Sequence, residues 1–382
     1  MKARVPLTLT ALTLATACLV ACSTASTSSS QTAAAAASGT ATAASTALAQ
    51  YTATPTELPV TAPLSKKPPT GVKVAFLQNG QTPGEQFSAA LQGAVKVLGW
   101  TEQDVNFDPS NPASIGSAFL TAVNAKVNVI VVQGLDSALY AKFVPSALAK
   151  HIVVIDTVSS GGTIPGVTYV DRSDSAGKPV ATIAVAAIMA DAKARHVTPH
   201  ILTVSSVLFT SLLTPMIGDI AADVKSANCG ACSAGVFDLS AQATISNAVT
   251  APVVSYLQTH PDINYLFTPN GSLSIGLLSA IQQAGMGTSI RLVGATPLPA
   301  QIAELKTGNP QDLGWIANSI VVVAWMSMDA AARVLVGDSA AMYAHVAAPT
   351  WLLTKDSGSA LVPDPVAPTD YVSKFMALWN VK

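Results

Sequence analysis

Short apolar runs alternate with amphipathic segments along most of this 382-residue chain. The clearest pair, residues 127–132 and 152–155, is rich in β-branched side chains and shows no apolar–polar alternation. Such runs are typical of strands covered on both faces, as in a parallel sheet. Between them, apolar residues recur at helical spacing, with Asp136 as the expected N-cap and Pro145 as a kink or the start of a second half. The pattern predicts a β-α-β unit.

The same alternation continues on both sides of this unit and starts again after residue 192. We expect further strands at residues 72–77, 104–107, 167–170, 201–205, 235–239, 265–268, 290–293 and 314–318, and a late extended segment at 348–354. We expect helices at residues 87–98, 114–124, 174–192, 217–226, 245–259, 273–283, 299–306, 321–335 and 371–379. Strands and helices that alternate over two halves predict an α/β fold with two Rossmann-like lobes, each built on a parallel sheet.

The carboxyl ends of the strands indicate where a ligand would lie. In open parallel sheets, ligands bind in the crevice beyond these ends. Gln133 and Asp156 stand at the ends of the first two runs. Both are therefore candidate ligand-binding residues.

The first 22 residues have the pattern of an export signal. Lys2 and Arg4 precede an uncharged apolar stretch, residues 5–20, which is short for a membrane span. It ends in Leu-Val-Ala-Cys22, which resembles the lipobox of bacterial lipoproteins. The resemblance implies cleavage before Cys22, a lipid on that cysteine and an extracytoplasmic protein anchored to the cell membrane. The alternatives are an ordinary secretory signal and an uncleaved anchor.

Residues 23–69 form a low-complexity segment of Ala, Ser and Thr, with prolines toward its end. The segment has few of the large apolar residues that offset chain entropy on folding. We therefore expect a disordered tether between the lipid and the folded body. The Ser and Thr content also permits O-glycosylation, which the sequence leaves open.

Composition argues against a membrane-spanning protein and against a nucleic-acid-binding protein. Hydrophobic residues make up 50% of the chain and charged residues only 11%. No apolar run after Cys22 reaches the roughly 18 to 20 residues that a membrane span requires. The net charge is −1 and no basic cluster occurs, so we expect no nucleic-acid partner.

The folded body contains two cysteines, Cys229 and Cys232, in a C-x-x-C pattern. A redox motif of this kind would open a helix after a strand, whereas this one follows a predicted helix and precedes a strand. In an exported protein we expect a structural disulfide that closes a turn. His196 and His200 have Pro199 between them and no carboxylate cluster beside them, so we expect no metal site.

Four stretches together resemble type I solute-binding proteins of the ribose-binding kind, the receptors that feed ATP-driven importers. They are VAFLQ…F…ALQGAVKVLGW at 74–100, VNVIVVQG…HIVVIDT at 127–157, DRSDSAG at 171–177 and YLFTPNGSLSIGLLSAIQQAG…RLVGATPLPAQIAELKTG at 265–308. Their order and spacing cover nearly all of residues 70–354. The resemblance implies a monomer that closes two lobes on a small molecule and delivers it to the permease subunits of an ABC importer.

The resemblance also implies how the chain divides between the lobes. A three-segment hinge would cross near Asp171, near residues 318–320 and near residues 346–349. The first lobe would then comprise residues 70–171 and 319–347. The second lobe would comprise residues 172–318 and 348–382.

The family's binding residues carry over in part. Phe87 stands where the family often stacks an aromatic ring on a sugar, and Asp156 stands where a carboxylate accepts hydroxyl bonds. Asn270, Thr296 and Asn318 stand at three further contact positions, together with Gln133 from the strand-end argument. We predict that Phe87, Asp156, Asn270 and Asn318 converge on one ligand.

Several charged partners of the family are replaced here by small or apolar residues. Each unmet hydroxyl bond costs about 1–3 kcal/mol. The sequence therefore favours a sugar-like ligand with fewer hydroxyls, or one bound partly by apolar contact. The alternative is that the loop 205–211, with Phe209, supplies substitute contacts.

No nucleophile, base and acid converge in the sequence, so we expect neither an enzyme nor a cofactor. Two functions remain. One is the receptor of an importer. The other is a tethered sensor that reports ligand occupancy to a membrane partner without transport.

Overall fold

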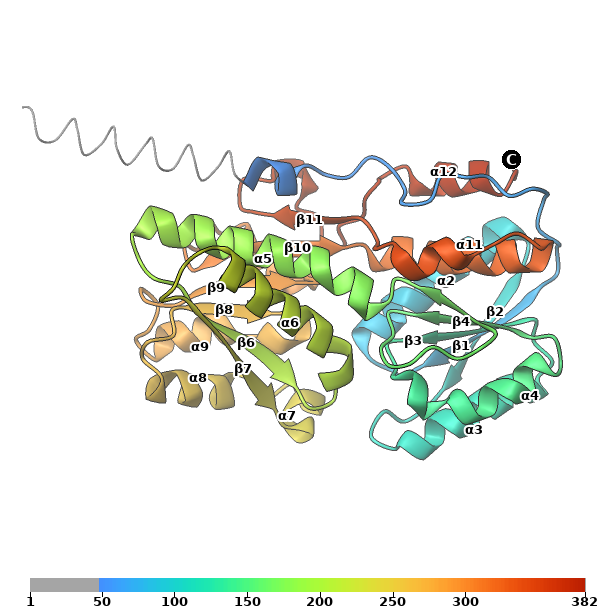
Figure 1. Cartoon of the computed structure of the whole chain (residues 1–382), viewed down its shortest axis with the longest axis horizontal. Coiled ribbons are helices and arrows are strands. Elements are labelled where there is room, and N and C mark those ends of the chain that lie inside the picture. The colour runs from blue at the N-terminus through green and yellow to red at the C-terminus, as the bar shows by residue number, and fades with distance from the viewer. Residues whose placement is uncertain (1–47, 382) are drawn as a thin grey trace, which may run out of the picture.

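The computed structural model describes residues 48–381 as two lobes that lie side by side (Figure 1). The predicted signal, Cys22 and residues 23–47 lie outside the described residues. The first lobe contains a five-stranded parallel sheet in the order β2-β1-β3-β4-β5. Its strands are β1 (Lys73–Gln78), β2 (Thr101–Asn106), β3 (Val129–Gln133), β4 (Val153–Thr157) and β5 (Val167–Val170).

The second lobe contains a six-stranded sheet in the order β11-β10-β9-β8-β6-β7. All its strand pairs are parallel except β10 with β11, which are antiparallel. Its strands are β6 (His200–Ser206), β7 (Ser233–Leu239), β8 (Tyr265–Thr268), β9 (Arg291–Ala295), β10 (Asp312–Asn318) and β11 (Thr350–Leu353). The predicted α/β fold with two lobes is confirmed.

Helices cover both faces of each sheet. The helices of the first lobe are α2 (Thr82–Leu98), α3 (Pro112–Asn124), α4 (Val144–Leu148) and α11 (Ile320–Val336). The helices of the second lobe are α5 (Ser173–Arg195), α6 (Thr210–Ser226), α7 (Ala241–Ile245), α8 (Thr250–Thr259), α9 (Leu277–Gln283) and α10 (Pro299–Leu305). The last helix is α12 (Tyr371–Leu378).

Burial explains why the predicted strands are found. Every residue of β3 and β8 is buried, as expected for strands covered on both faces. Gly99 and Gly337 end α2 and α11 in the left-handed region, with φ of 70° and 86°, which glycine adopts without steric cost. In the segment between β3 and β4, Asp136 accepts a bond from the N–H of Ala138 as predicted, and Pro145 lies in the first turn of α4.

Several predicted helices differ from the structure. Helix α2 begins at Thr82 rather than at residue 87, with Pro83 in its first turn. Helix α6 begins at Thr210 rather than at 217. The single helix predicted at 245–259 is divided into α7 and α8, and Ser240 caps α7 by accepting a bond from the N–H of Ala243.

The end of the chain returns to the first lobe, so the expectation that residues 348–382 belong to the second lobe is wrong for α12. Trp379 stacks on Trp325 of α11, with ring centroids 5.4 Å apart and planes 6° apart. Phe375 and Leu378 are buried in the same core. Figure 1 shows α12 alongside α11.

Residues 48–66 form a strap that runs across both lobes, and the expectation of disorder is wrong for this part of the chain (Figure 1). Leu48 and Tyr51 pack against the core of the second lobe. Leu58, Val60 and Leu64 are buried in the core of the first lobe. These few aliphatic residues lie within a segment of otherwise low complexity, which is why composition alone did not reveal them.

Backbone hydrogen bonds hold the strap against the first lobe. Leu64 N–H donates to Leu378 O at 2.8 Å, and Arg333 Nη2 donates to Ala62 O at 2.5 Å. Arg333 in turn donates through Nε to Asp329 Oδ2, which also accepts from Tyr343. The strap is therefore bound to a buried polar network as well as to an apolar surface.

Three segments that connect the lobes lie between β5 and α5 at 171–172, between β10 and α11 at 319, and before β11 at 346–349. The strap and the segment that leads from β11 to α12 add two further connections between the lobes within the described part of the chain. No helix in residues 48–381 has the length and apolar character of a bilayer span.

Candidate functional site

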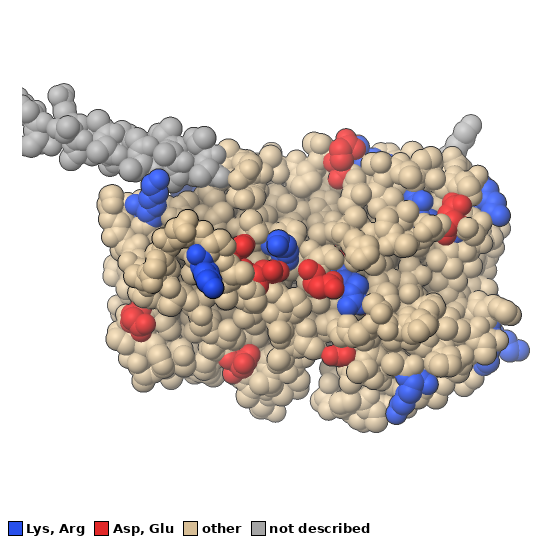
Figure 2. All heavy atoms as spheres, in the orientation of Figure 1, with Lys and Arg blue, Asp and Glu red and all other residues tan. Residues whose placement is uncertain are grey.

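A cavity of about 170 Å³ lies between the lobes, at the carboxyl ends of strands from both sheets. It is the position that the topology of open parallel sheets favours for a ligand. Figure 2 shows an opening between the lobes on its lower edge and few charged side chains on this face. The lining residues are Asn79, Gln81, Pro83, Gly84, Gln133, Gly134, Val158, Asp171, Ser173, Ala176, Gly177, Val180, Phe209, Leu212, Leu213, Met216, Pro269, Asn270, Ala295, Thr296, Asn318, Ile320 and Val323.

Four of the six predicted ligand-binding residues line this cavity: Gln133, Asn270, Thr296 and Asn318. They come from the ends of β3, β8, β9 and β10, which the fold brings together. No hydrogen bond to another described residue engages the side-chain amide of Gln133 or Asn318. Asn270 Oδ1 accepts from the N–H of Ser272, which leaves its amide N–H groups available. These amides provide neutral donors and acceptors for a ligand.

Phe87 does not line the cavity, which corrects its assignment as a stacking residue. Helix α2 begins five residues earlier than predicted, so Thr82, Pro83 and Gly84 occupy the cleft end of the helix. Phe87 therefore lies more than one turn farther in. It is fully buried and packs on Phe76, with ring centroids 5.1 Å apart.

Asp156 does not line the cavity either, which corrects its assignment as a ligand contact. Strand β4 extends to Thr157, so Asp156 lies within the strand rather than after it. It is fully buried and one carboxylate oxygen accepts from the Tyr140 hydroxyl. Its other oxygen has no hydrogen-bond partner among the described residues. Burial raises the pKa of Asp156 to about 7, against the opposing effects of its hydrogen bonds and of Arg172 nearby.

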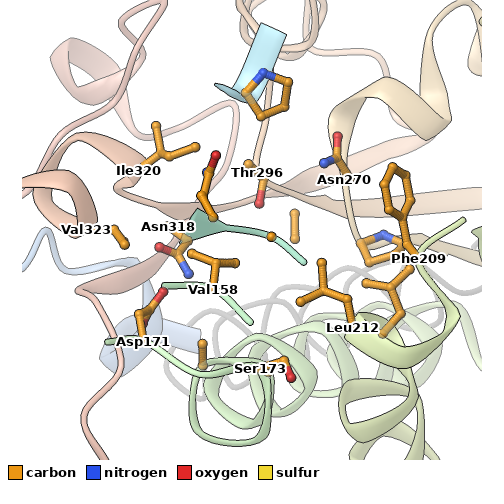
Figure 3. A pocket seen from close by; sticks show the side chains of 18 of the residues that line it. Val158, Asp171, Ser173, Phe209, Leu212, Asn270, Thr296, Asn318, Ile320 and Val323 are labelled. Atoms are coloured by element: carbon orange, nitrogen blue, oxygen red, sulfur yellow. The ribbon is translucent and has the colours of Figure 1, made fainter. Parts of the chain in front are cut away.

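Asp171 is the only charged residue among those that line the cavity, and from the sequence we placed it only near a hinge crossing. Its Oδ1 accepts from the N–H of Ala348 at 2.6 Å, and Figure 3 shows its carboxylate near Asn318. Burial raises the pKa of Asp171 to about 6, and the bond from Ala348 opposes that rise. Its position directly after β5 was a usable signal, since the other predicted contacts also follow strands.

An apolar wall faces the amides. Phe209, Leu212, Leu213 and Met216 come from the loop after β6 and the first turns of α6. Val158, Ile320 and Val323 lie on the first-lobe side (Figure 3). The aromatic residue of the site is therefore Phe209, as the alternative based on the loop 205–211 allowed. The early start of α6, which periodicity missed, places these side chains at the cavity.

Backbone strain is concentrated at the same place. Among the described residues, the β-branched residues with positive φ are Val158 at 51° and Thr296 at 48°, and both line the cavity. Asp171 also has a positive φ, 51°. This conformation is costly for β-branched side chains and persists where the surroundings impose it, commonly at binding sites.

The close packing of the loops after β8 and β9 explains why no acidic residue follows Asn270. Gly271 stands where the resemblance would place an aspartate after Asn270. A Cβ atom at Gly271 would lie 2.9 Å from Thr296 O and 3.0 Å from Leu298 N. Because backbone cannot yield as a side chain can, any larger residue would force the loops after β8 and β9 apart. The cavity therefore has no charged side chain at this position.

Cys229 and Cys232 form a disulfide in the turn between α6 and β7, on the second lobe and apart from the cavity lining. Within residues 48–381, no three His, Cys, Asp or Glu side chains gather in a geometry that would hold a metal ion.

A family model described as "Periplasmic binding protein domain" matches residues 74–339. No curated protein matches the chain in sequence. Among solved structures, a 5-methylthioribose transporter solute-binding protein from Thermotoga lettingae has a TM-score of 0.64 at 14% identity, covering 83% of this chain and 95% of its own.

Two further structures are similar. A carbohydrate transporter solute-binding protein from Agrobacterium radiobacter, solved with D-arabinose, has a TM-score of 0.62 at 17% identity and covers 76% of this chain and 96% of its own. A glucose-galactose binding protein from Geobacillus stearothermophilus has a TM-score of 0.61 at 16% identity and covers 76% of this chain and 100% of its own. At these identities the likeness shows the shared fold.

Proposed function

Because the chain belongs to the periplasmic binding protein domain family, we propose that it is a non-catalytic receptor that closes its two lobes on a neutral, sugar-like ligand with few hydroxyl groups. The observation that carries this proposal is the composition of the cavity lining. Side-chain amides whose N–H groups have no partner among the described residues occupy one part, and an aliphatic and aromatic wall occupies the rest.

The small number of amide groups beside a larger apolar wall limits how many hydroxyl groups the ligand can carry. Each hydroxyl removed from water needs a partner, at about 1–3 kcal/mol for each one left unmet. Gln133, Asn270 and Asn318, with Asp171, satisfy a small number of hydroxyls. The apolar wall is suited to a deoxy, alkyl or thioether group. The similar Thermotoga lettingae protein is named for 5-methylthioribose, a sugar that combines these two characters.

The proposal extends to the setting of the receptor. Behind its signal, Cys22 would carry a lipid that holds the protein at the outer face of the cell membrane, where it would deliver its ligand to an ABC permease. A Cys22→Ala variant tests the anchor, because the protein should then move from the membrane to the soluble fraction. Unchanged membrane retention would contradict lipidation.

Ligand identification tests the binding function. We expect native mass spectrometry of the gently purified protein to detect a bound small neutral molecule. Asn318→Ala should weaken its affinity about tenfold or more, because a ligand hydroxyl loses its partner. Asn124→Ala, at the exposed end of α3, is the matched control and should leave affinity unchanged. Equal losses in both variants, or none in either, would place the site elsewhere.

A further inference from the structure

A second cavity, of about 320 Å³, adjoins the first. Thr296, Asn318 and Ile320 line both, so these three residues stand between the two spaces. The remaining residues around the second cavity are Gln86, Ala89, Ala90, Pro297, Ala317, Val321, Asp364, Pro365, Val366 and Tyr371. Eight of its thirteen lining residues are Ala, Pro, Val or Ile, so its surface is mostly apolar.

Both lobes bound this second cavity. Gln86, Ala89 and Ala90 belong to α2 of the first lobe. Thr296, Pro297 and Ala317 belong to the second lobe. The segment 364–366 leads from β11 to α12, with Ala367 buried in the core of the second lobe and Val366 packed against the core of the first. Gln86 Nε2 donates to Asp364 Oδ1 at 3.0 Å, which ties α2 to this connecting segment beside the cavity.

The polar groups of the second cavity are few, and two of them are already used. Gln86 and Asp364 are bonded to each other, and Asp364 is the one charged group among the residues that line this space, where its carboxylate disfavours an anionic ligand. The small side chains Ala89, Ala90 and Ala317 leave room, and Val366 and Tyr371 offer apolar contact. A space of this kind gains most from an uncharged apolar group, because burying apolar surface is favourable in proportion to its area.

We propose that the two cavities are two subsites for one ligand, in which a sugar ring occupies the first and an uncharged alkyl or aryl substituent occupies the second. This proposal rests on the proposed function and adds the substrate class to it. Asn318 lies at the junction, where its amide bonds the atom that links ring and substituent. The Gln86–Asp364 bond holds the outer wall of the second subsite between α2 and the segment that connects β11 to α12.

Calorimetry with free sugars and their glycosides tests whether the second cavity binds a substituent of the sugar. The probes are free pentoses and hexoses, each alongside its methyl and phenyl glycosides. We expect at least one phenyl glycoside to bind tenfold or more tightly than its free sugar. Ala89→Leu, which directs a larger side chain into the second cavity, should abolish that preference and leave the affinity for the free sugar within twofold. Ala113→Leu, on the exposed start of α3, is the matched control and should retain the preference.

The outcomes separate the two proposals. If free sugars bind and no glycoside binds more tightly, the second subsite is overturned and the receptor function stands. The second subsite is also overturned if Ala89→Leu keeps the full preference. If neither free sugars nor glycosides bind, the proposed sugar-receptor function fails, and the second subsite fails with it.

Discussion

Asp171 accepts a 2.6 Å hydrogen bond from the backbone N–H of Ala348, and this bond joins two of the hinge crossings inside the ligand cavity. The N–H of Asp171 also donates to Tyr343 O at 3.3 Å. One carboxylate oxygen thus fixes the hinge while the residue lines the ligand site. A ligand bonded to Asp171 would act directly on the segment about which the lobes move.

We predict that Asp171→Asn weakens binding of the co-purified ligand about ten- to a hundredfold while the protein still folds. The amide oxygen retains the bond from Ala348, but the charge-assisted bond to a ligand hydroxyl is lost. Because the pKa of Asp171 is raised to about 6, wild-type affinity should also be lower at pH 5 than at pH 8. Titration calorimetry of both proteins at both pH values checks this, and a variant with the same pH dependence as wild type would contradict it.

We predict that Asp156 makes the protein less stable as pH rises. Its pKa is about 7 in the folded state and near 3.9 when unfolded, so the folded state binds more protons between these values. The free energy of unfolding should therefore fall as pH rises from about 4 to about 7. Asp156→Asn removes the titration and keeps an oxygen for Tyr140, so its stability should depend less on pH.

Urea unfolding at pH 5 and pH 8 measures this effect. The expected loss for wild type is on the order of a few kcal/mol, and the variant should show a smaller one. Asp262→Asn, on an exposed loop, is the control and should follow wild type. A wild type that gains stability toward pH 8, with Asp156→Asn showing the same gain, would refute the prediction.

We predict that Trp379→Phe is more destabilising than Trp351→Phe. Trp379 Nε1 donates to the fully buried Asp329 Oδ1 at 2.8 Å, so its loss leaves a buried carboxylate oxygen unpaired. Trp351 is also buried, but its Nε1 has no partner among the described residues. The difference between the two variants should be about 1–3 kcal/mol in the free energy of unfolding. Equal losses by urea unfolding would show that this bond contributes no net stability.

We predict that the strap stabilises the first lobe. Leu64 is 3% exposed and lies in the core with α11 and α12, so Leu64→Ala should lower the free energy of unfolding by about 2–4 kcal/mol. Leu120→Ala, at a position 37% exposed on α3, is the matched control and should change it by less than about 1 kcal/mol. Thermal and urea unfolding of both variants check the comparison. An unchanged Leu64→Ala protein would mean that the strap is not held in solution.

The order of strands and helices could be predicted because buried strands such as β3 and β8 need continuous apolar side chains, which the sequence shows directly. The starts of helices could not, because Thr82 and Thr210 precede the first residue with a clear apolar period. That error of one or two turns misplaced Phe87 and hid Leu212 and Met216. Asp156 was assigned to the ligand site because the strand was expected to end at residue 155. Strand β4 runs to Thr157, so the Asp156 side chain points to one face of the sheet rather than beyond its end.

The remaining errors concern contacts between distant segments. The burial of Leu58 and Leu64 depends on α11 and α12, more than 250 residues away along the chain, and no local pattern reveals it. Asn270, Thr296 and Asn318 came from the family resemblance, and they line the cavity because the topology brings the ends of neighbouring strands together. Position after a strand was therefore a better guide to the site than residue type.

The strap also sets the reach of the receptor. With a lipid on Cys22 and a wholly free linker, residues 23–69 could extend about 170 Å at full stretch. Since the chain is bound to the second lobe from Leu48 onward, only residues 23–47 separate the lipid from the body, and their full stretch is at most about 90 Å. If Cys22 carries the proposed lipid, the shorter tether would confine the protein to a thinner layer above the membrane and would raise its effective concentration at the proposed permease.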